Sequence, residues 1–447
     1  MNEWTEAESR VERARRLFDK GSLSQAAAEL NAAIDVNPYN PSWHFNLGLT
    51  LEALADYRGA AEAFRRAMEL GAEDKEARNA LGVNLSRLGQ YAEALECFER
   101  LEKIDPLYEP SYCNRIITYT EIGEHEKAEL MFYMARQVQE ECPLCCYNIA
   151  SSLFARGQYD RAIGCWRRAL EIDPDCTQAY ARLAEAYRAK GEPASAREFY
   201  ESAVQARPDD VQALLDLAEL LVETGDIARA GSCYRRVLDL KPDSAAAHCG
   251  LGDIARKQNE LETAERRYRI AAEMDRRLPG VYARLGQVLI KQRRFQDAAD
   301  MLIREVAAGG ENADTLREVG QLLIEARQPT HANVVLRRLV ELEPEDPSAQ
   351  HNLAVSYFML DRMEEGLRHC RRALKLRPDY TLALYNLALA HLQAGQVGRA
   401  RRYASRALTR APHDERVSEL SRQLGVDGFW SKLRVRLTDW AFRPKLR

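Results

Sequence analysis

The sequence predicts an all-α solenoid of about twelve tandem helix–turn–helix repeats, followed by a C-terminal capping helix. The 447-residue chain falls into twelve consecutive blocks of 34 residues, from Ala7 to Asp414, without insertion or deletion. Alanine, leucine, arginine and glutamate dominate, whereas the β-branched and aromatic alternation typical of strands is scarce. Stacked repeats share one elongated core, so this length does not require separate globular domains.

Within each block, two positions show how a pair of helices packs. Position 8 is small in every block except one, where it is Ile116. Position 24 is bulky, and its residues include Leu30, Phe64, Phe98, Phe132, Trp166, Tyr200, Tyr234 and Tyr268. A small residue opposite a bulky one lets two antiparallel helices approach closely.

Two further positions mark the turns. Position 15, between the two helices, is often glycine: Gly21, Gly89, Gly123, Gly157, Gly191, Gly225 and Gly395. Position 32, which ends the second helix, is often proline: Pro38, Pro106, Pro174, Pro208, Pro242, Pro344, Pro378 and Pro412. Three consecutive blocks, those that begin at Ala245, Pro279 and Ala313, replace the glycine with Asn259, Arg293 and Arg327. The block that begins at Pro279 also places Glu305 at a small apolar position, so we expect an irregularity near residues 305–313.

This pattern resembles the tetratricopeptide repeat, for example in Leu47-Gly48…Ala60…Phe64…Ala67. It recurs in Tyr180…Leu183-Ala184…Tyr187…Ala196…Tyr200…Ala203…Pro208. The resemblance implies a right-handed superhelix whose first helices line a concave groove for an extended peptide or a helix of a partner. The array is also similar to the superhelical repeat arm of O-linked N-acetylglucosamine transferase, without a catalytic domain.

On a first helix, positions 2, 5, 6, 9, 12 and 13 are expected to face that groove. Position 6 is asparagine in five blocks, and a row of amides can hold a peptide backbone with little regard to its sequence. Apolar residues beside these amides are candidate anchors. The predicted partner-binding residues are Phe45, Asn46, Leu49, Asn114, Ile117, Tyr147, Asn148, Phe154, Asn352, Phe358, Tyr385 and Asn386. Of these, the segment from Phe45 to Phe154 is the expected principal docking surface.

The sequence assigns no catalytic residue, cofactor or metal ligand, and the chain is predicted not to be an enzyme. The run from Cys142 to Cys146 contains one C-x2-C pair, which supplies only two of the four ligands that zinc needs. Cys113, Cys165 and Cys176 lie in neighbouring repeats, so a redox or metal role stays open. The ten cysteines are otherwise interpreted as reduced thiols of a cytoplasmic protein.

The ends differ from the array. Residues 1–6 form a lead-in, 415–425 a capping helix, and 426–447 a basic amphipathic tail. From residue 429 to 447, six basic residues accompany one acidic residue. This segment is a second cap, a helix for an anionic membrane surface or acidic partner, or a disordered end. The net charge of −4 does not favour nucleic acid.

The leading hypothesis is a cytoplasmic scaffold or adaptor that binds a protein segment in the groove. The first alternative is an assembly factor, peripheral to a membrane, that attaches through its tail. The second is a substrate-recruiting subunit of a glycosyltransferase or another enzyme.

Overall fold

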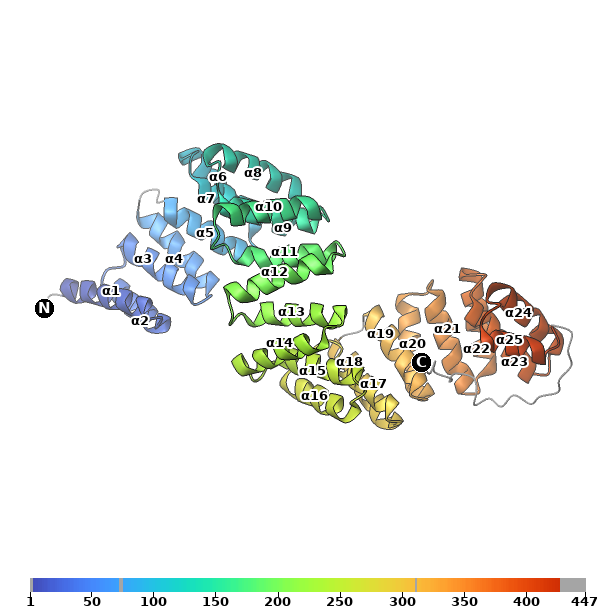
Figure 1. The fold of residues 1–447 in the computed structure, drawn as a ribbon. Coiled ribbons are helices and arrows are strands. Elements are labelled where there is room, and N and C mark those ends of the chain that lie inside the picture. The colour runs from blue at the N-terminus through green and yellow to red at the C-terminus, as the bar shows by residue number, and fades with distance from the viewer. Residues whose placement is uncertain (1–2, 72–74, 310–311, 427–447) are drawn as a thin grey trace. The chain divides into compact units, whose positions relative to one another are not determined.

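The computed structural model describes residues 3–71, 75–309 and 312–426, which form helices joined by short turns (Figure 1). No strand occurs among these residues. None of the helices in these three ranges is long and apolar enough to cross a membrane. The predicted amphipathic helix at 429–447 lies outside the described residues.

The chain divides into two compact units, Met1–Ala213 and Leu214–Arg447. The N-terminal unit contains α1 (Glu3–Asp19), α2 (Leu23–Val36), α3 (Pro41–Ala53), α4 (Tyr57–Leu70), α5 (Lys75–Arg87), α6 (Tyr91–Ile104), α7 (Glu109–Ile122), α8 (His125–Val138), α9 (Pro143–Ala155), α10 (Tyr159–Ile172), α11 (Gln178–Ala189) and α12 (Pro193–Ala206). Helix α13 (Val211–Thr224) begins in this unit and continues into the next.

The C-terminal unit continues with α14 (Ile227–Leu240), α15 (Ala245–Lys257), α16 (Leu261–Met274), α17 (Val281–Lys291), α18 (Phe295–Gly309), α19 (Ala313–Glu325), α20 (Pro329–Leu342), α21 (Pro347–Met359), α22 (Met363–Leu376), α23 (Thr381–Gln393), α24 (Val397–Arg410) and α25 (Glu415–Gln423). The predicted repeat architecture is confirmed, because these helices follow the 34-residue register in pairs. Helix α1 begins at Glu3, within the segment that the register treats as a lead-in.

Small and bulky residues pack together inside a repeat, as predicted. A Cβ atom added to Gly48 on α3 would lie 2.6 Å from Cε1 of Phe64 on α4. The same substitution at Gly82 on α5 would bring a Cβ atom to 2.5 Å from Cε1 of Phe98 on α6. Real carbon contacts are far longer, so only glycine admits these rings without a shift. The space between the helices of these two repeats is therefore filled by one aromatic ring.

In the repeat with Ile116 at position 8, a different side chain fills the space between the two helices. The Ile116 side chain is fully buried, whereas Phe132, at the bulky position, is only half-buried. The Phe132 ring lies beside Tyr133, with ring centroids 5.9 Å apart, and Met131 occupies the buried site on α8 instead. In this repeat the first helix therefore supplies the large buried side chain that the second helix supplies in other repeats.

Position 15 adopts the left-handed conformation in all twelve repeats. Seven of these residues are the predicted glycines, and φ lies between 71° and 90°. The other five are Ala55, Asn259, Arg293, Arg327 and Asp361, with φ between 54° and 62°. A side chain in this region costs about 1–2 kcal/mol, except where a short polar side chain such as asparagine compensates. The turn geometry is therefore imposed by helix packing even where glycine is missing.

Glu305 on α18 is not a disruption of the core, although the repeat pattern expects a small apolar residue there. Its side chain is buried, and its carboxylate accepts backbone N–H groups at the start of α17. The donors are Gly280 at 2.8 Å, Tyr282 at 3.0 Å and Ala283 at 3.1 Å. The first N–H groups of a helix have no partner within the helix, so this carboxylate caps α17 from a neighbouring helix.

The last repeat is covered by α25. Leu420 and Leu424 are buried in one cluster with Ala404 of α24. Val417 is buried with Leu384 of α23 and Ala407 of α24. Helix α25 therefore shields the apolar side of the final helix pair, as expected of a capping helix.

Candidate functional site

First helices of successive repeats lie against one another within each unit. Helix α7 contacts both α5 and α9 in the N-terminal unit. In the C-terminal unit, α19 contacts α17 and α21, and α21 contacts α23. Side chains on these helices can therefore meet across repeat boundaries, which is where the predicted partner-binding residues lie.

Two asparagines of the predicted row are bonded to the preceding repeat. The Asn114 side chain donates to Oδ1 of Asn79 at 2.9 Å. The Asn386 amide lies 2.8 Å from Nε2 of His351, which accepts its N–H when that nitrogen carries no proton. These amides stabilise the stacking of neighbouring repeats, so they are not free to bind a peptide without breaking an internal bond.

Charged residues at position 6 make the same kind of contact. Arg284 on α17 pairs with Asp253 on α15, at 3.3 Å. Glu318 on α19 accepts a hydrogen bond from Gln287 on α17, at 3.2 Å. In these four repeats, position 6 therefore joins first helices of adjacent repeats, whether it carries an amide or a charge.

Several predicted residues of the N-terminal unit reach solvent. Leu49 on α3 is 38% exposed and Ile117 on α7 is 40% exposed, and both occupy position 9. Asn46 is exposed, and Asn148 on α9 is half-buried. Phe45 is half-buried, with its ring edge-on to Phe64 at 5.6 Å. Leu49, Ile117 and Asn46 are therefore accessible to solvent, and their role in docking stays a prediction.

The aromatic residues of α9 are more constrained. Phe154 is half-buried between Tyr159 and Trp166, with ring centroids 5.4 and 5.9 Å away. Tyr147 is half-buried and bonds to Arg182 of the next repeat. Burial lowers the pKa of Arg182, but hydrogen bonds to Glu185 and Tyr147 outweigh it and raise that pKa. Tyr147 and Phe154 thus contribute mainly to packing between neighbouring helices.

Two predicted docking residues of the C-terminal unit lie in the core instead. Phe358 is 1% exposed, and a Cβ atom on Gly366 would lie within 2.4 Å of its ring. Asn386 is 5% exposed, and its side chain lies 2.8 Å from Nε2 of His351. The prediction of a partner-accessible surface is therefore wrong for both residues. Asn352 and Tyr385 are half-buried.

Phe358 is buried because it fills the space that a bulky residue at position 24 fills in other repeats. Cys370 takes the bulky position 24 and is fully buried, but it is too small to fill the space. Phe358 on α21 fills it, and Gly366 on α22 replaces the alanine common at position 20 to admit the ring. A glycine at that position was the one sequence signal of this exchange.

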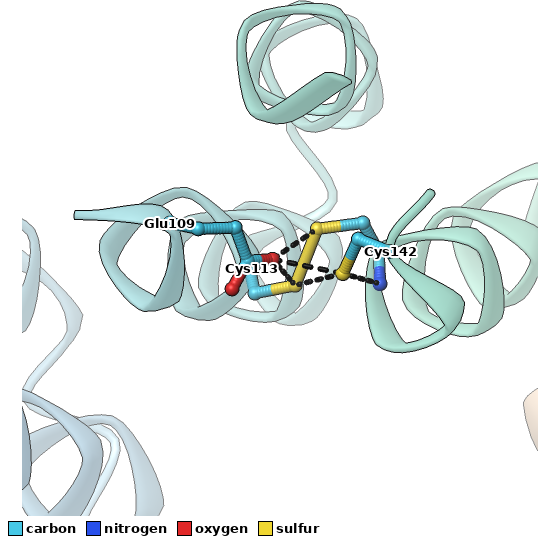
Figure 2. A group of neighbouring side chains, drawn as sticks. Glu109, Cys113 and Cys142 are labelled. Atoms are coloured by element: carbon cyan, nitrogen blue, oxygen red, sulfur yellow. Dashed lines mark hydrogen bonds between the residues drawn. A yellow bond between two sulfur atoms is a disulfide. The ribbon is translucent and has the colours of Figure 1, made fainter. Parts of the chain in front are cut away.

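Three cysteines and one glutamate converge between the N-terminal ends of α7 and α9 (Figure 2). One ligand atom from each of Glu109, Cys113, Cys142 and Cys145 lies within 4.8 Å of the others. Cys113 and Cys145 form a disulfide, with Cα atoms 5.3 Å apart. The prediction that all cysteines are free thiols is therefore wrong for this pair, while the other eight are free.

Sequence reasoning missed Glu109 and included two cysteines that do not belong. Cys165 and Cys176 are not members of the cluster. Glu109 is the first residue of α7 and lies one turn before Cys113, a spacing that puts both on one helix face. Burial, with Glu109 nearby, raises the pKa of the Cys142 thiol to about 12.

Sequence models of repeat families match most of the chain. Tetratricopeptide-repeat models match residues 14–54, 75–108, 144–209 and 362–424. A model described as the C-terminal domain of cilia and flagella-associated protein 70 matches residues 178–381. No curated protein matches the sequence.

Solved structures with similar arrangements share little sequence. A structure titled as the APC/C hetero-tetramer Cut9–Hcn1 is 16% identical, with a TM-score of 0.41, and covers 92% of this chain and 95% of that one. Yeast Tom70 is 16% identical, with a TM-score of 0.39, and the match covers 94% of this chain and 96% of Tom70. YrrB, titled a TPR protein with an unusual peptide-binding site, is 22% identical, with a TM-score of 0.35 and coverage of 42% and 96%.

The register of helix pairs, the small-to-bulky packing and the matches of several repeat models along the sequence agree. This chain belongs to the tetratricopeptide-repeat superfamily.

Proposed function

We propose that the chain is a protein-interaction scaffold whose N-terminal unit binds an extended segment of a partner protein along its first helices. The observation that carries this proposal is the exposure of Leu49 and Ile117 at the same repeat position, next to amide side chains. Isolated apolar side chains are common on surfaces, but Leu49 and Ile117 occupy the same position of two repeats and so offer a partner segment two matching anchor points. The proposal assigns no catalytic step to the chain.

The chemistry of this surface favours a partner with apolar side chains on an extended backbone. Leu49 and Ile117 can bury aliphatic groups of the partner. Asn46 and Asn148 can donate to and accept from its peptide groups. Asn114 is bonded to Asn79, so it positions the repeats instead of binding the partner directly. Of the partner-binding residues predicted from the sequence for the N-terminal unit, this proposal keeps those that solvent reaches.

The test is selection of short peptides from a displayed random library on the full-length protein, followed by fluorescence anisotropy with one selected peptide. We expect Ile117→Gln and Leu49→Gln each to weaken binding about tenfold, since losing burial of one aliphatic side chain costs about 1.5 kcal/mol. Asn148→Ala should weaken it less. Circular dichroism would confirm that each variant is folded.

Leu130→Gln is the matched control. Leu130 is 54% exposed and lies on α8, the second helix of the repeat that contains Ile117. Its replacement should leave the affinity unchanged. If Leu130→Gln abolishes binding while Ile117→Gln does not, the partner docks on the second helices and the proposal is wrong. Enrichment of no peptide at all would also contradict it.

A further inference from the structure

The four-residue cluster between α7 and α9 is more than a disulfide requires. A disulfide uses two sulfur atoms, here those of Cys113 and Cys145. A third cysteine, Cys142, is 4% exposed, and its Sγ lies 3.7 Å from Sγ of Cys113. The Glu109 carboxylate points at the same spot (Figure 2). A buried thiol and a carboxylate have no role in the disulfide and need a separate explanation.

One carboxylate oxygen contacts all three sulfur atoms. Oε1 of Glu109 lies 3.1 Å from Sγ of Cys113, 2.8 Å from Sγ of Cys142 and 2.9 Å from Sγ of Cys145. Disulfide sulfurs carry no hydrogen, so in the oxidised form only Cys142 can donate to this oxygen. The contacts with the other two bring lone pairs together without a proton between them. A cation bound between the Glu109 oxygen and these sulfur atoms offsets the repulsion between their lone pairs.

The described surroundings do not supply that cation as a side chain. No lysine or arginine pairs with Glu109 in residues 3–71, 75–309 and 312–426. What they do supply is the N-terminal end of a helix. Cys142 is the N-cap of α9, and its Sγ accepts the backbone N–H of Cys145 at 3.1 Å.

The donor set and its spacing fit zinc. Zinc in structural sites takes four ligands in a tetrahedron, with Zn–S about 2.3 Å, which separates neighbouring sulfurs by about 3.8 Å. Cys113 and Cys142 already have this separation. Reduction frees Cys113 and Cys145 to move apart. The three distances between the Glu109 oxygen and the sulfurs, now 2.8–3.1 Å, need to grow to about 3.6 Å to fit a Zn–O bond of about 2.1 Å. Glu109 is only half-buried, so it has room to move outward.

We propose that, when Cys113 and Cys145 are reduced, Glu109, Cys113, Cys142 and Cys145 bind one Zn²⁺ ion. With four protein ligands this is a closed, structural site that joins the first helices of two adjacent repeats. Disulfide and metal exclude each other, because both use the same two sulfur atoms. Zinc is preferred to magnesium or calcium because three of the four donors are soft sulfur atoms.

The test uses the full-length chain reduced with a phosphine under argon. The phosphine takes an oxygen atom from water to become its oxide, and the two sulfur atoms take two protons to become thiols. Co²⁺ then serves as the spectroscopic probe, because tetrahedral cobalt thiolates have intense visible and near-ultraviolet absorption. Each thiol ligand loses its proton to the buffer as the metal binds. We expect saturation at one Co²⁺ per chain and replacement of Co²⁺ by Zn²⁺.

Variants decide whether these four residues are the ligands. Cys142→Ser and Cys145→Ser should each weaken Co²⁺ binding by at least about tenfold, since even changes to partners of metal ligands typically cost 10- to 100-fold. Glu109→Gln should shift the cobalt spectrum and weaken binding, because an amide is a poorer ligand. Cys176→Ser, outside the cluster, is the matched control and should leave the titration unchanged.

A second readout separates binding from misfolding. Zn²⁺ should raise the thermal unfolding midpoint of the reduced wild type and of Cys176→Ser, but not of Cys142→Ser. Absence of a thiolate–cobalt band in the reduced wild type overturns the proposal. So does a band of equal strength and affinity in Cys142→Ser and Cys145→Ser, which would place the metal elsewhere. An unchanged spectrum in Glu109→Gln would remove the carboxylate from the ligand set and refute the four-ligand site.

Discussion

Glu305 gives the sharpest test of how one repeat is held together. Replacing it with alanine removes the acceptor of three backbone N–H groups at the start of α17, of which those of Tyr282 and Ala283 are buried. An unsatisfied buried donor costs about 1–3 kcal/mol, so two of them predict a loss of about 2–6 kcal/mol. Glu305→Gln keeps one acceptor oxygen but loses the negative charge, so we expect about 1–2 kcal/mol.

The assay should be local as well as global, because repeat arrays need not unfold in one step. Urea denaturation followed by circular dichroism would give the overall loss. Hydrogen exchange would report the protection of the Tyr282 and Ala283 amides, which should fall in Glu305→Ala. Glu260→Ala is the control, because Glu260 is an exposed N-cap of α16 without a side-chain capping bond. If Glu305→Ala exchanges and unfolds like this control, the capping role is refuted.

Three further predictions concern packing, turns and pH. Gly82→Ala should cost about 1–3 kcal/mol by forcing the Phe98 ring to move, whereas Gly164→Ala, which faces open space, should gain about 0.5–1 kcal/mol in urea denaturation. Ala55→Gly should stabilise by about 0.5–1 kcal/mol by relieving a left-handed alanine, and a midpoint unchanged or lowered would contradict this. Burial lowers the pKa of His351 to about 4. Above about pH 6.5 the imidazole is neutral in both the folded and the unfolded chain. Below that pH only the unfolded chain binds the proton, so the free energy of unfolding falls towards pH 4. Between pH 7 and pH 5 the free energy of unfolding should fall by about 2 kcal/mol. Urea denaturation at both pH values should show this fall in the wild type but not in His351→Gln.

The sequence was sufficient to predict the fold because the repeat pattern is a direct record of helix packing. A small residue at position 8 opposite a bulky one at position 24 lets the two helices of a repeat cross closely, as Gly48 and Phe64 show. The left-handed turn could be predicted at glycines but not at Ala55 or Arg293, because neither residue favours that conformation. Packing of the flanking helices overrides the local preference there.

The candidate sites were less predictable because they depend on contacts between repeats. Asn386 looked like a surface amide, yet its partner His351 lies 35 residues away and on another helix. Connectivity of cysteines cannot be deduced from their spacing, so the Cys113–Cys145 bond could not be assigned. Glu109 gave no signal of its own, because an acidic residue is ordinary in the first turn of a helix.

The two kinds of contact in this array respond differently to gain or loss of a repeat. In several repeats the ring that fills the helix pair, such as Phe98 against Gly82, comes from the same repeat, so it stays with that repeat when the segment is duplicated or deleted. Pairs such as Asn114 with Asn79, and Arg284 with Asp253, join different repeats and are broken when a repeat is inserted between them. A ring inside a repeat is thus kept when a repeat is gained or lost, whereas a pair between two first helices is kept only if both neighbouring repeats stay adjacent.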